Sequence, residues 1–376
     1  MIRHCRAGKQ FARVAYRRPV PRGVQGAFAN RVAPPTAAMP ARCDSYRSHS
    51  IRLHVVWLLA VLLGAATLAP TGCGGEDGGA GEPTADNPVE LRIGETAGIP
   101  FAFLRFGVDK GFYRDAGLAV EAVPVQGAAP IVSGVVSGDF AMGGSDTATF
   151  AQAIARDVPL TMITPGTSVS SRPEQDFSAV QVSPRSGIGS PGDLRGKTIG
   201  VNILGNISEV SISGALEKLG VGPKSVEYTE IPFPDMVAAV QRERVDAALT
   251  IEPFRTIGDA AGLRTLFGPF TTFERGLQIG SIVTTESYAE GNPEVISAFQ
   301  KAHARTARYV REHEQEFRRT LPKVAQLEPA LADKVNLPVW EEGVDPASVE
   351  RVADAMTQQA LVREEPDVRA AIHDGA

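Results

Sequence analysis

Short apolar segments alternate with helical patterns along the chain, and the same order occurs twice. The first copy has strands at residues 91–93, 118–123 and 140–142 and helices at 104–111 and 130–136; the second has strands at 198–201, 226–231 and 245–250 and helices at 210–219 and 236–240. This alternation is typical of parallel βαβ units, whose strands are buried on both faces and whose crossovers are right-handed. Two copies predict an α/β protein of two lobes with a cleft between them.

The length and composition agree with that prediction. A chain of 376 residues exceeds one ordinary hydrophobic core, so two domains are expected, and 43% hydrophobic with 22% charged residues is typical of a globular protein. Residues 1–72 hold 11 Lys or Arg and one acid, which leaves 27 basic and 42 acidic residues from Cys73 onward, a net charge of about −15. This acidic balance argues against nucleic acid as a partner.

The first 50 residues are rich in Arg, Ala and Pro and show no sustained apolar period, so we assign them no structure. Two interpretations stay open. The sequence begins upstream of the true start codon, which is then Met39 or a later one, or the segment is a genuine disordered cytoplasmic extension.

Residues 51–73 have the features of a secretory signal. Three arginines between residues 42 and 52 are followed by the uninterrupted apolar run Val55–Ala69. Because this run is too short for a comfortable membrane span, it is more typical of the apolar core of a signal peptide than of a transmembrane helix.

The end of this signal resembles that of a bacterial lipoprotein, since a glycine directly precedes Cys73 and a Gly-, Pro- and acid-rich tether follows at residues 74–88. The resemblance implies that Cys73 is acylated and anchors the mature protein to the outer face of the plasma membrane or in the periplasm. The other two cysteines are then removed with the signal. Pro70 stands where lipoprotein signals usually have Leu. Simple cleavage and an uncleaved anchor are the alternatives.

From residue 89 onward, short motifs follow one another in a specific order. They are Leu91–Gly94, Lys110–Tyr113, Ala116–Leu118, Gln126–Gly127, Ser137–Gly138, Phe150–Ala153, Ser186–Ile188, Asp193–Lys197, Gly205, Val245–Ala247, Glu252–Phe254, Leu337–Trp340 and Leu361–Val362. Their combination, over residues 89–372, resembles the substrate-binding proteins of ABC importers for sulfonates, nitrate, taurine and thiamine-pyrimidine precursors. Each motif alone would be weak.

The resemblance implies a type II periplasmic-binding-protein-like fold, in which each lobe is a mainly parallel sheet flanked by helices. Lobe I would comprise residues 89–177 and 279–376, lobe II residues 178–278, and two strands near 177–182 and 277–283 would form a hinge. It also implies a small-molecule solute, an ABC permease with its ATPase as partners, a monomer, and no cofactor or metal.

Ligands of open α/β sheets bind beyond the carboxyl ends of the strands, where loops and helix N-termini converge. The loops at residues 145–147 and 205–208 each precede a helical pattern, so their backbone N–H groups are expected to face an anionic head group. With the family resemblance, the predicted ligand-binding residues are Thr96, Phe101, Phe103, Gln126, Gly127, Gly144, Ser145, Asp146, Thr147, Thr167, Gly205, Asn206, Ile207, Ser208 and Glu252.

These assignments have structural alternatives. Asp146, Asn206 and the neighbouring serines could be helix N-caps only, the two phenylalanines could be core residues, and Thr167 could lie in a solvated turn. Glu252 could accept from an amine or ring N–H of a ligand, which would disfavour nitrate and simple sulfonates. Alternatively it is an acid at a helix start, stabilised by the helix dipole.

We predict a solute-binding lipoprotein and not an enzyme. The main rival is a pyrimidine-precursor synthase on the same fold, whose iron-dependent members carry a cysteine cluster and a histidine. From Cys73 onward the chain has one cysteine and three histidines, His303, His313 and His373, all in its C-terminal part. His303 and His313 are interpreted as surface or core-edge residues. No zinc, nucleotide or catalytic-triad motif is present. A ligand-sensing subunit that contacts a membrane receptor is a third possibility, which neighbouring permease and ATPase genes would distinguish.

Overall fold

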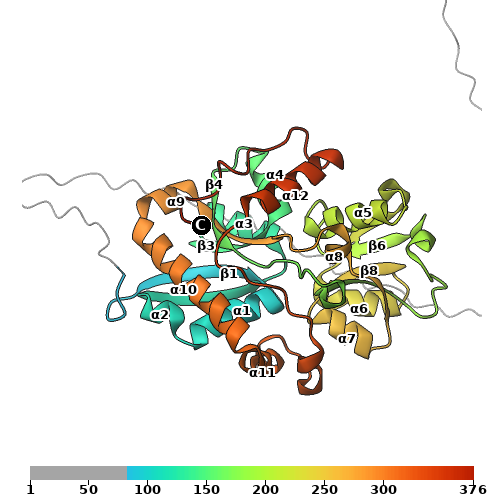
Figure 1. Ribbon diagram of the computed structural model, residues 1–376, viewed down its shortest axis with the longest axis horizontal. Coiled ribbons are helices and arrows are strands. Elements are labelled where there is room, and N and C mark those ends of the chain that lie inside the picture. Colours follow the sequence, from blue (N-terminus) through green and yellow to red (C-terminus); the bar gives the residue numbers. More distant parts are fainter. Residues whose placement is uncertain (1–82) are drawn as a thin grey trace, which may run out of the picture. The chain divides into compact units, whose positions relative to one another are not determined.

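The computed structural model describes residues 83–376, which form two five-stranded sheets with helices packed around them (Figure 1). The N-terminal extension, the signal with Cys73 and most of the tether lie outside the described residues. Within residues 83–376, no helix is both long and apolar enough to cross a membrane.

Lobe I contains the strands β1 (Val89–Thr96), β2 (Leu118–Val125), β3 (Met142–Asp146), β4 (Leu160–Pro165) and β10 (Gly280–Thr285). Their order in the sheet is β2-β1-β3-β10-β4. Strand β1 is parallel to β2 and β3, whereas β10 is antiparallel to both of its neighbours. The sheet is therefore mainly parallel, with one strand in the opposite direction.

Lobe II contains β5 (Ser178–Val182), β6 (Thr198–Val201), β7 (Glu227–Glu230), β8 (Ala247–Ile251) and β9 (Arg264–Phe267). Their order is β7-β6-β8-β5-β9, and here β5 is the strand that runs antiparallel to its neighbours. Both β5 and β10 directly follow a crossing of the chain from one lobe to the other. This explains why each of them enters its sheet against the direction of the βαβ units.

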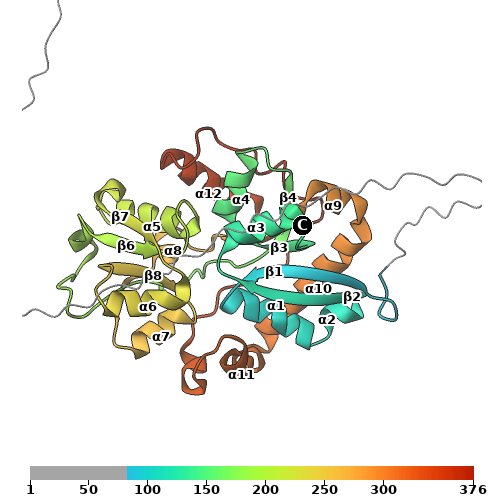
Figure 2. The same cartoon turned by 180° about the vertical axis from the view of Figure 1, so that it is seen from behind.

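Helices cover both sheets, as the two opposite views show (Figures 1 and 2). In lobe I they are α1 (Ile99–Asp109), α2 (Phe112–Asp115), α3 (Ala128–Ser137), α4 (Thr147–Ile154), α9 (Glu286–Gly291), α10 (Pro293–Glu312), α11 (Glu314–Val324) and α12 (Pro346–Gln358); in lobe II, α5 (Ile207–Lys218), α6 (Phe233–Gln241), α7 (Phe254–Ala260) and α8 (Pro269–Phe273). Short 3-10 turns occur at Pro173–Gln175, Pro191–Leu194, Pro223–Ser225 and Pro329–Lys334. Helix α12 packs against α4 of lobe I and also against α5 of lobe II.

Strand β3 lies later in the chain than the apolar pattern predicts. The pattern ends at residue 142, but the strand runs to Asp146 and includes Gly143 and Gly144. A Cβ on Gly143 would lie 2.2 Å from the side chain of Ile131. Glycine is needed for this close approach, and because it has no side chain it leaves no apolar signal in the sequence.

Apolar positions from Ile296 to Phe317 recur at helical spacing and predict one long amphipathic helix after Asn292, but the structure divides it in two. Helix α10 ends at Glu312, and His313, with φ −128° and ψ 42°, separates it from α11. The break lets α11 turn so that Phe317 packs edge-on against Trp340, with the ring centroids 5.4 Å apart. The sequence also predicts a helix at residues 328–335, and the structure has a 3-10 turn there, at Pro329–Lys334.

The two connections between the lobes pair with each other. The Val169 N–H donates to the carbonyl of Leu277 at 2.8 Å, and Ser168 and Val339 exchange backbone hydrogen bonds of 2.8 and 3.0 Å. The segment around Val339 thus lies beside this antiparallel pair. The paired crossing segments are residues 166–169 and 277–280, whereas most of the predicted hinge strands belong to the sheets themselves.

Candidate functional site

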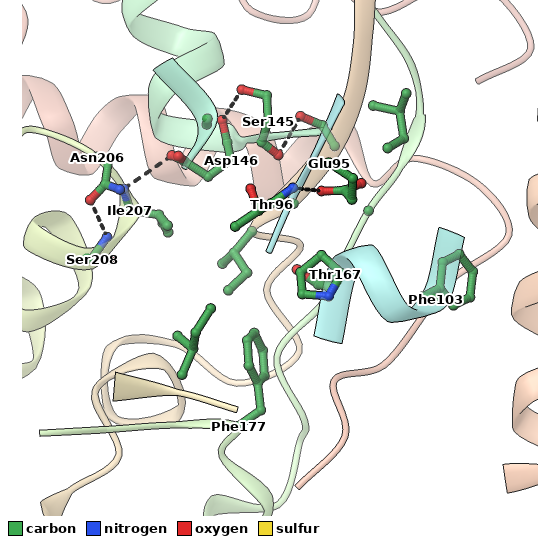
Figure 3. A pocket seen from close by; sticks show the side chains of 18 of the residues that line it. Glu95, Thr96, Phe103, Ser145, Asp146, Thr167, Phe177, Asn206, Ile207 and Ser208 are labelled. Atoms are coloured by element: carbon green, nitrogen blue, oxygen red, sulfur yellow. Dashed lines mark hydrogen bonds between the residues drawn. The ribbon is translucent and has the colours of Figure 1, made fainter. Parts of the chain in front are cut away.

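A cavity lies where the two lobes and the crossing segments meet (Figure 3). The centre of a water molecule can reach about 80 Å³ of it. A site for one bound water needs only about 10–15 Å³, so the cavity has room for more than one water molecule. Its size is therefore that of a small solute.

Eight of the predicted ligand-binding residues line this cavity: Thr96, Phe103, Ser145, Asp146, Thr167, Asn206, Ile207 and Ser208. They come together because β1 and β3 are parallel neighbours, so that their carboxyl ends meet at one edge of the sheet, opposite the start of α5. Their role in binding stays a prediction, but the structure brings them to one place.

The first N–H groups of α5 already have partners. The N–H of Ile207 donates to Asp146 Oδ1 across the lobes at 3.2 Å, and that of Ser208 donates to Asn206 Oδ1 at 2.9 Å. Asp146 also caps α4 by accepting from the N–H of Thr149 at 2.8 Å. Asp146 and Asn206 are thus N-caps as well as cavity residues, and a carboxylate lies where we expected the anionic head group of a ligand (Figure 3).

A second hydrogen bond joins the lobes near this point. Gln152 Nε2, on α4, donates to the carbonyl oxygen of Gly205 at 2.9 Å. Burial raises the pKa of Asp146, and hydrogen bonds from Thr149 and Ile207 oppose that effect. Together, the two contacts describe a conformation in which the lobes touch directly beside the cavity.

The remaining predicted residues are not among those that line the cavity: Phe101, Gln126, Gly127, Gly144, Thr147, Gly205 and Glu252. Thr147 is fully buried, and its N–H and hydroxyl both donate to the carbonyl of Ile279, at 3.0 and 3.4 Å. Gln126 is exposed. Phe101 and Phe103 are two residues apart on α1, or about 200° around the helix axis, so only one of them can face the cavity.

Glu252 is not among the residues that line the cavity, and its carboxylate has partners within the protein, so its role as a ligand acceptor stays a prediction. Its carboxylate accepts from the N–H of Thr256 at 3.1 Å, the hydroxyl of Thr256 at 2.9 Å and the N–H of Asn336 at 2.9 Å. Burial raises its pKa to about 7, against the effect of these hydrogen bonds. The side chain stabilises the start of α7 and holds the segment near Asn336, which corresponds to the alternative of a helix-start acid.

A different acid faces the cavity, and the sequence-based prediction missed it. Glu95, on β1, lines the cavity and is 7% exposed. Its Oε1 accepts from the N–H of Thr96 at 2.7 Å (Figure 3). Burial raises its pKa to about 8, and the hydrogen bond from Thr96 opposes this. Burial therefore disfavours the ionised form of this carboxyl group, and only one hydrogen bond from the described part of the protein stabilises it.

Gly144 makes room for that carboxyl group. A Cβ at position 144 would lie 2.0 Å from Glu95 Oε1 and 2.5 Å from Oε2. The sequence contained one signal of this arrangement: in the alternating pattern of β1, Glu95 falls on the same face as the buried Leu91 and Ile93. An acid at a buried position of a strand is uncommon and indicates a site.

His303 also lines the cavity, although we interpreted it as a surface or core-edge residue. It is 2% exposed, and its Nδ1 lies 3.2 Å from the hydroxyl of Tyr113. Burial lowers its pKa to about 4, with the Pro165 carbonyl opposing, so the ring is neutral near pH 7. Among residues 83–376, no group of three or more His, Cys, Asp or Glu residues could hold a metal ion.

Aromatic rings form much of the remaining wall. Phe103 stacks on Trp340 with ring centroids 4.7 Å apart, and Phe177 packs against Phe270 at 5.1 Å. Phe233 adds a fifth ring. Among the described residues that line the cavity, none is Lys or Arg. The site therefore combines aromatic surface and two carboxyl groups without a permanent positive charge.

Comparisons with known proteins agree with the two-lobed fold. The chain is 27% identical to the taurine-binding periplasmic protein of Escherichia coli (strain K12) over 195 residues, which are 52% of this chain and 58% of that protein. The crystal structure of the periplasmic aliphatic sulfonate-binding protein of Escherichia coli has a TM-score of 0.62 at 20% identity, covering 77% of this chain and 94% of that one. The alkanesulfonate-binding protein of Xanthomonas axonopodis pv. citri bound to MOPS has a TM-score of 0.66 at 18% identity, covering 76% and 99%.

The match in sequence spans just over half the length of the taurine-binding relative, and the structural likenesses establish the fold. The predicted two-lobed periplasmic-binding-protein-like architecture is confirmed. The family model described as NMT1/THI5 like matches residues 100–317, more than half of the chain. This protein belongs to the NMT1/THI5-like family.

Proposed function

We propose that this protein is the extracytoplasmic solute-binding component of an ABC importer, which captures a small polar organic solute or oxyanion between its lobes and delivers it unchanged to a permease. The observation that carries the proposal is the cavity itself. It is small, it lies at the carboxyl ends of β1 and β3, and residues of both lobes line it. The similarity to a taurine-binding periplasmic protein and to a periplasmic sulfonate-binding protein supports this role.

The connections between the lobes suit such a capture. Two antiparallel crossing segments, residues 166–169 and 277–280, join sheets that are otherwise separate. Hinges of this kind let two rigid lobes close by changes at a few residues. In the closed arrangement the Asp146–Ile207 and Gln152–Gly205 hydrogen bonds form beside the bound solute.

Anchoring through Cys73 is part of the proposal, and it would keep the lobes near a permease in the same membrane. The synthase alternative has less support, because residues 83–376 contain no cysteine and hence none of the cluster that iron-dependent members carry. A sensing role would use the same cavity and closure. Adjacent genes for a permease and an ATPase favour transport.

Isothermal titration calorimetry with taurine, ethanesulfonate, nitrate, ethanolamine and an aminopyrimidine tests the proposal. At least one compound is expected to bind with one-to-one stoichiometry. Gln152→Ala removes one interlobe hydrogen bond, worth about 0.5–1.5 kcal/mol, and is expected to weaken that binding about two- to tenfold. Gln315→Ala, at an exposed position of α11, is the matched control and should leave affinity unchanged. Failure of every compound to bind at millimolar concentration would contradict the proposed function.

A further inference from the structure

We propose that the solute of this cavity is a small organic cation that carries N–H groups, held by the carboxylate of Glu95 between aromatic rings, and that it is not an oxyanion such as a sulfonate or nitrate. The inference rests on the proposed function and narrows it to one class of substrate. The groups that face the cavity, and the hydrogen-bonding capacity that the protein leaves unused on them, indicate this class.

Glu95 offers an acceptor that the protein does not saturate. Its Oε1 accepts one hydrogen bond, from Thr96, whereas Oε2 has no hydrogen-bond partner within the described part of the chain. A carboxylate can accept about four hydrogen bonds. Since Glu95 is more than nine-tenths buried and lines the cavity, the missing donors have to come from the solute or from water.

The electrostatics of the cavity oppose an anion. A sulfonate or nitrate would find no Lys or Arg in the described cavity lining to neutralise its charge, and that charge would oppose ionisation of the nearby Glu95 and Asp146 carboxyl groups. His303 is uncharged near neutral pH because burial lowers its pKa to about 4. The helix starts do not supply N–H donors for an anion either. In α5, the N–H of Ile207 already donates to Asp146. In α1, the first turn contains Pro100, and proline has no N–H.

The aromatic walls suit the organic part of a cation. Trp340 and Phe103 form one stacked pair on the cavity wall, and Phe177 and Phe270 form another pair. The faces of such rings attract ammonium and guanidinium groups, most strongly where water is excluded. The small size of the cavity suits a compact aliphatic amine or amidine.

Binding of a cation would be linked to loss of a proton. The pKa of Glu95 is raised by burial to about 8, so the carboxyl is mostly protonated at neutral pH before binding. The titratable groups around it are Asp146 from the end of β3, His303 from α10 and Tyr113 from α2, whose own pKa is raised by burial and by the Glu95 charge. None of these groups supplies a positive charge at neutral pH. A bound ammonium would favour the ionised form of Glu95.

The test is calorimetry with compounds of matched size: ethanolamine and propylamine as cations, ethanesulfonate and nitrate as anions. The amines are expected to bind and the anions are not. Below about pH 8, amine affinity should rise about tenfold per pH unit, because one proton leaves Glu95 for each cation bound. Glu95→Gln keeps the shape and the acceptor for Thr96 but cannot ionise. It should weaken amine binding at least about 30-fold at pH 8 and abolish the pH slope.

Glu90→Gln is the control, because it makes the same substitution at an exposed position of the same strand and should change neither affinity nor slope. Thermal unfolding of both variants verifies that they fold. Binding of ethanesulfonate or nitrate without binding of the amines overturns the inference while it upholds the proposed function. Amine binding that Glu95→Gln leaves unchanged also overturns it. Binding of neither class at millimolar concentration contradicts the proposed function as well.

Discussion

Gly144→Ala is expected to weaken solute binding at least about 30-fold, because the new Cβ would displace the whole Glu95 carboxyl group from its place beside the cavity. The distances to be relieved are 2.0 Å to Oε1, 2.4 Å to Cδ and 2.5 Å to Oε2. Overpacking of this kind should also lower the free energy of unfolding by about 1–3 kcal/mol. Calorimetry with the tightest-binding compound of the panel and denaturant unfolding measure the two effects separately.

The adjacent glycine is the matched control for this prediction. A Cβ at Gly143 would lie 2.2 Å from Ile131 on the opposite face of β3, away from Glu95. Gly143→Ala should therefore cost a similar free energy of unfolding, about 1–3 kcal/mol, but leave affinity within about threefold of the wild type. Equal losses of affinity in the two variants would show that general destabilisation, and not the position of Glu95, determines binding.

The second large effect is a loss of stability with rising pH. In the absence of added solute, the wild-type protein is expected to lose roughly 2–3 kcal/mol of unfolding free energy between about pH 6 and pH 8. Glu95 contributes most, since its pKa is raised from 4.5 in the unfolded chain to about 8 in the folded protein. Its stabilising contribution is fully present below pH 4.5 and disappears as the pH rises through about 8, because the folded protein holds the proton more tightly.

Two other groups act in the same interval. Glu252, whose pKa is raised to about 7, adds to the loss of unfolding free energy as the pH rises. His303, whose pKa is lowered to about 4, partly offsets that loss near pH 6. Glu95→Gln removes only the first contribution and should leave a change smaller by about 2 kcal/mol over the same interval. Urea unfolding at several pH values gives both curves. Parallel curves for the wild type and the variant would mean that Glu95 does not bind a proton more tightly in the folded protein.

The alternation of apolar segments and helical patterns predicted the two lobes, because strands buried on both faces of a parallel sheet appear in the sequence as short apolar runs. It failed where glycine replaces an apolar side chain, as at Gly143 and Gly144, because a close backbone approach leaves no pattern. It also joined α10 and α11, since Phe317 keeps the helical spacing across the break at His313. The tertiary contact of Phe317 with Trp340 depends on a turn that spacing alone does not reveal.

Topology predicts which loops gather at the cavity, whereas the direction of each side chain decides whether it faces the cavity. Thr96, Ser145 and Asn206 follow from the rule that ligands bind at strand ends and helix starts. Glu252 satisfied the same rule, but its carboxylate turns to Thr256 and Asn336. Glu95 precedes the strand end and was passed over, although the alternation of β1 places it inward. A buried acid in a strand was the more informative signal.

The two lobes are expected to close on a solute that stays chemically unchanged. Small-angle X-ray scattering, with and without a saturating concentration of the tightest-binding compound, tests it most directly, with NMR of the compound recorded on the same sample. The expected result is a smaller radius of gyration with the compound recovered intact. An unchanged radius of gyration at saturation, or conversion of the compound into a product, would contradict the claim.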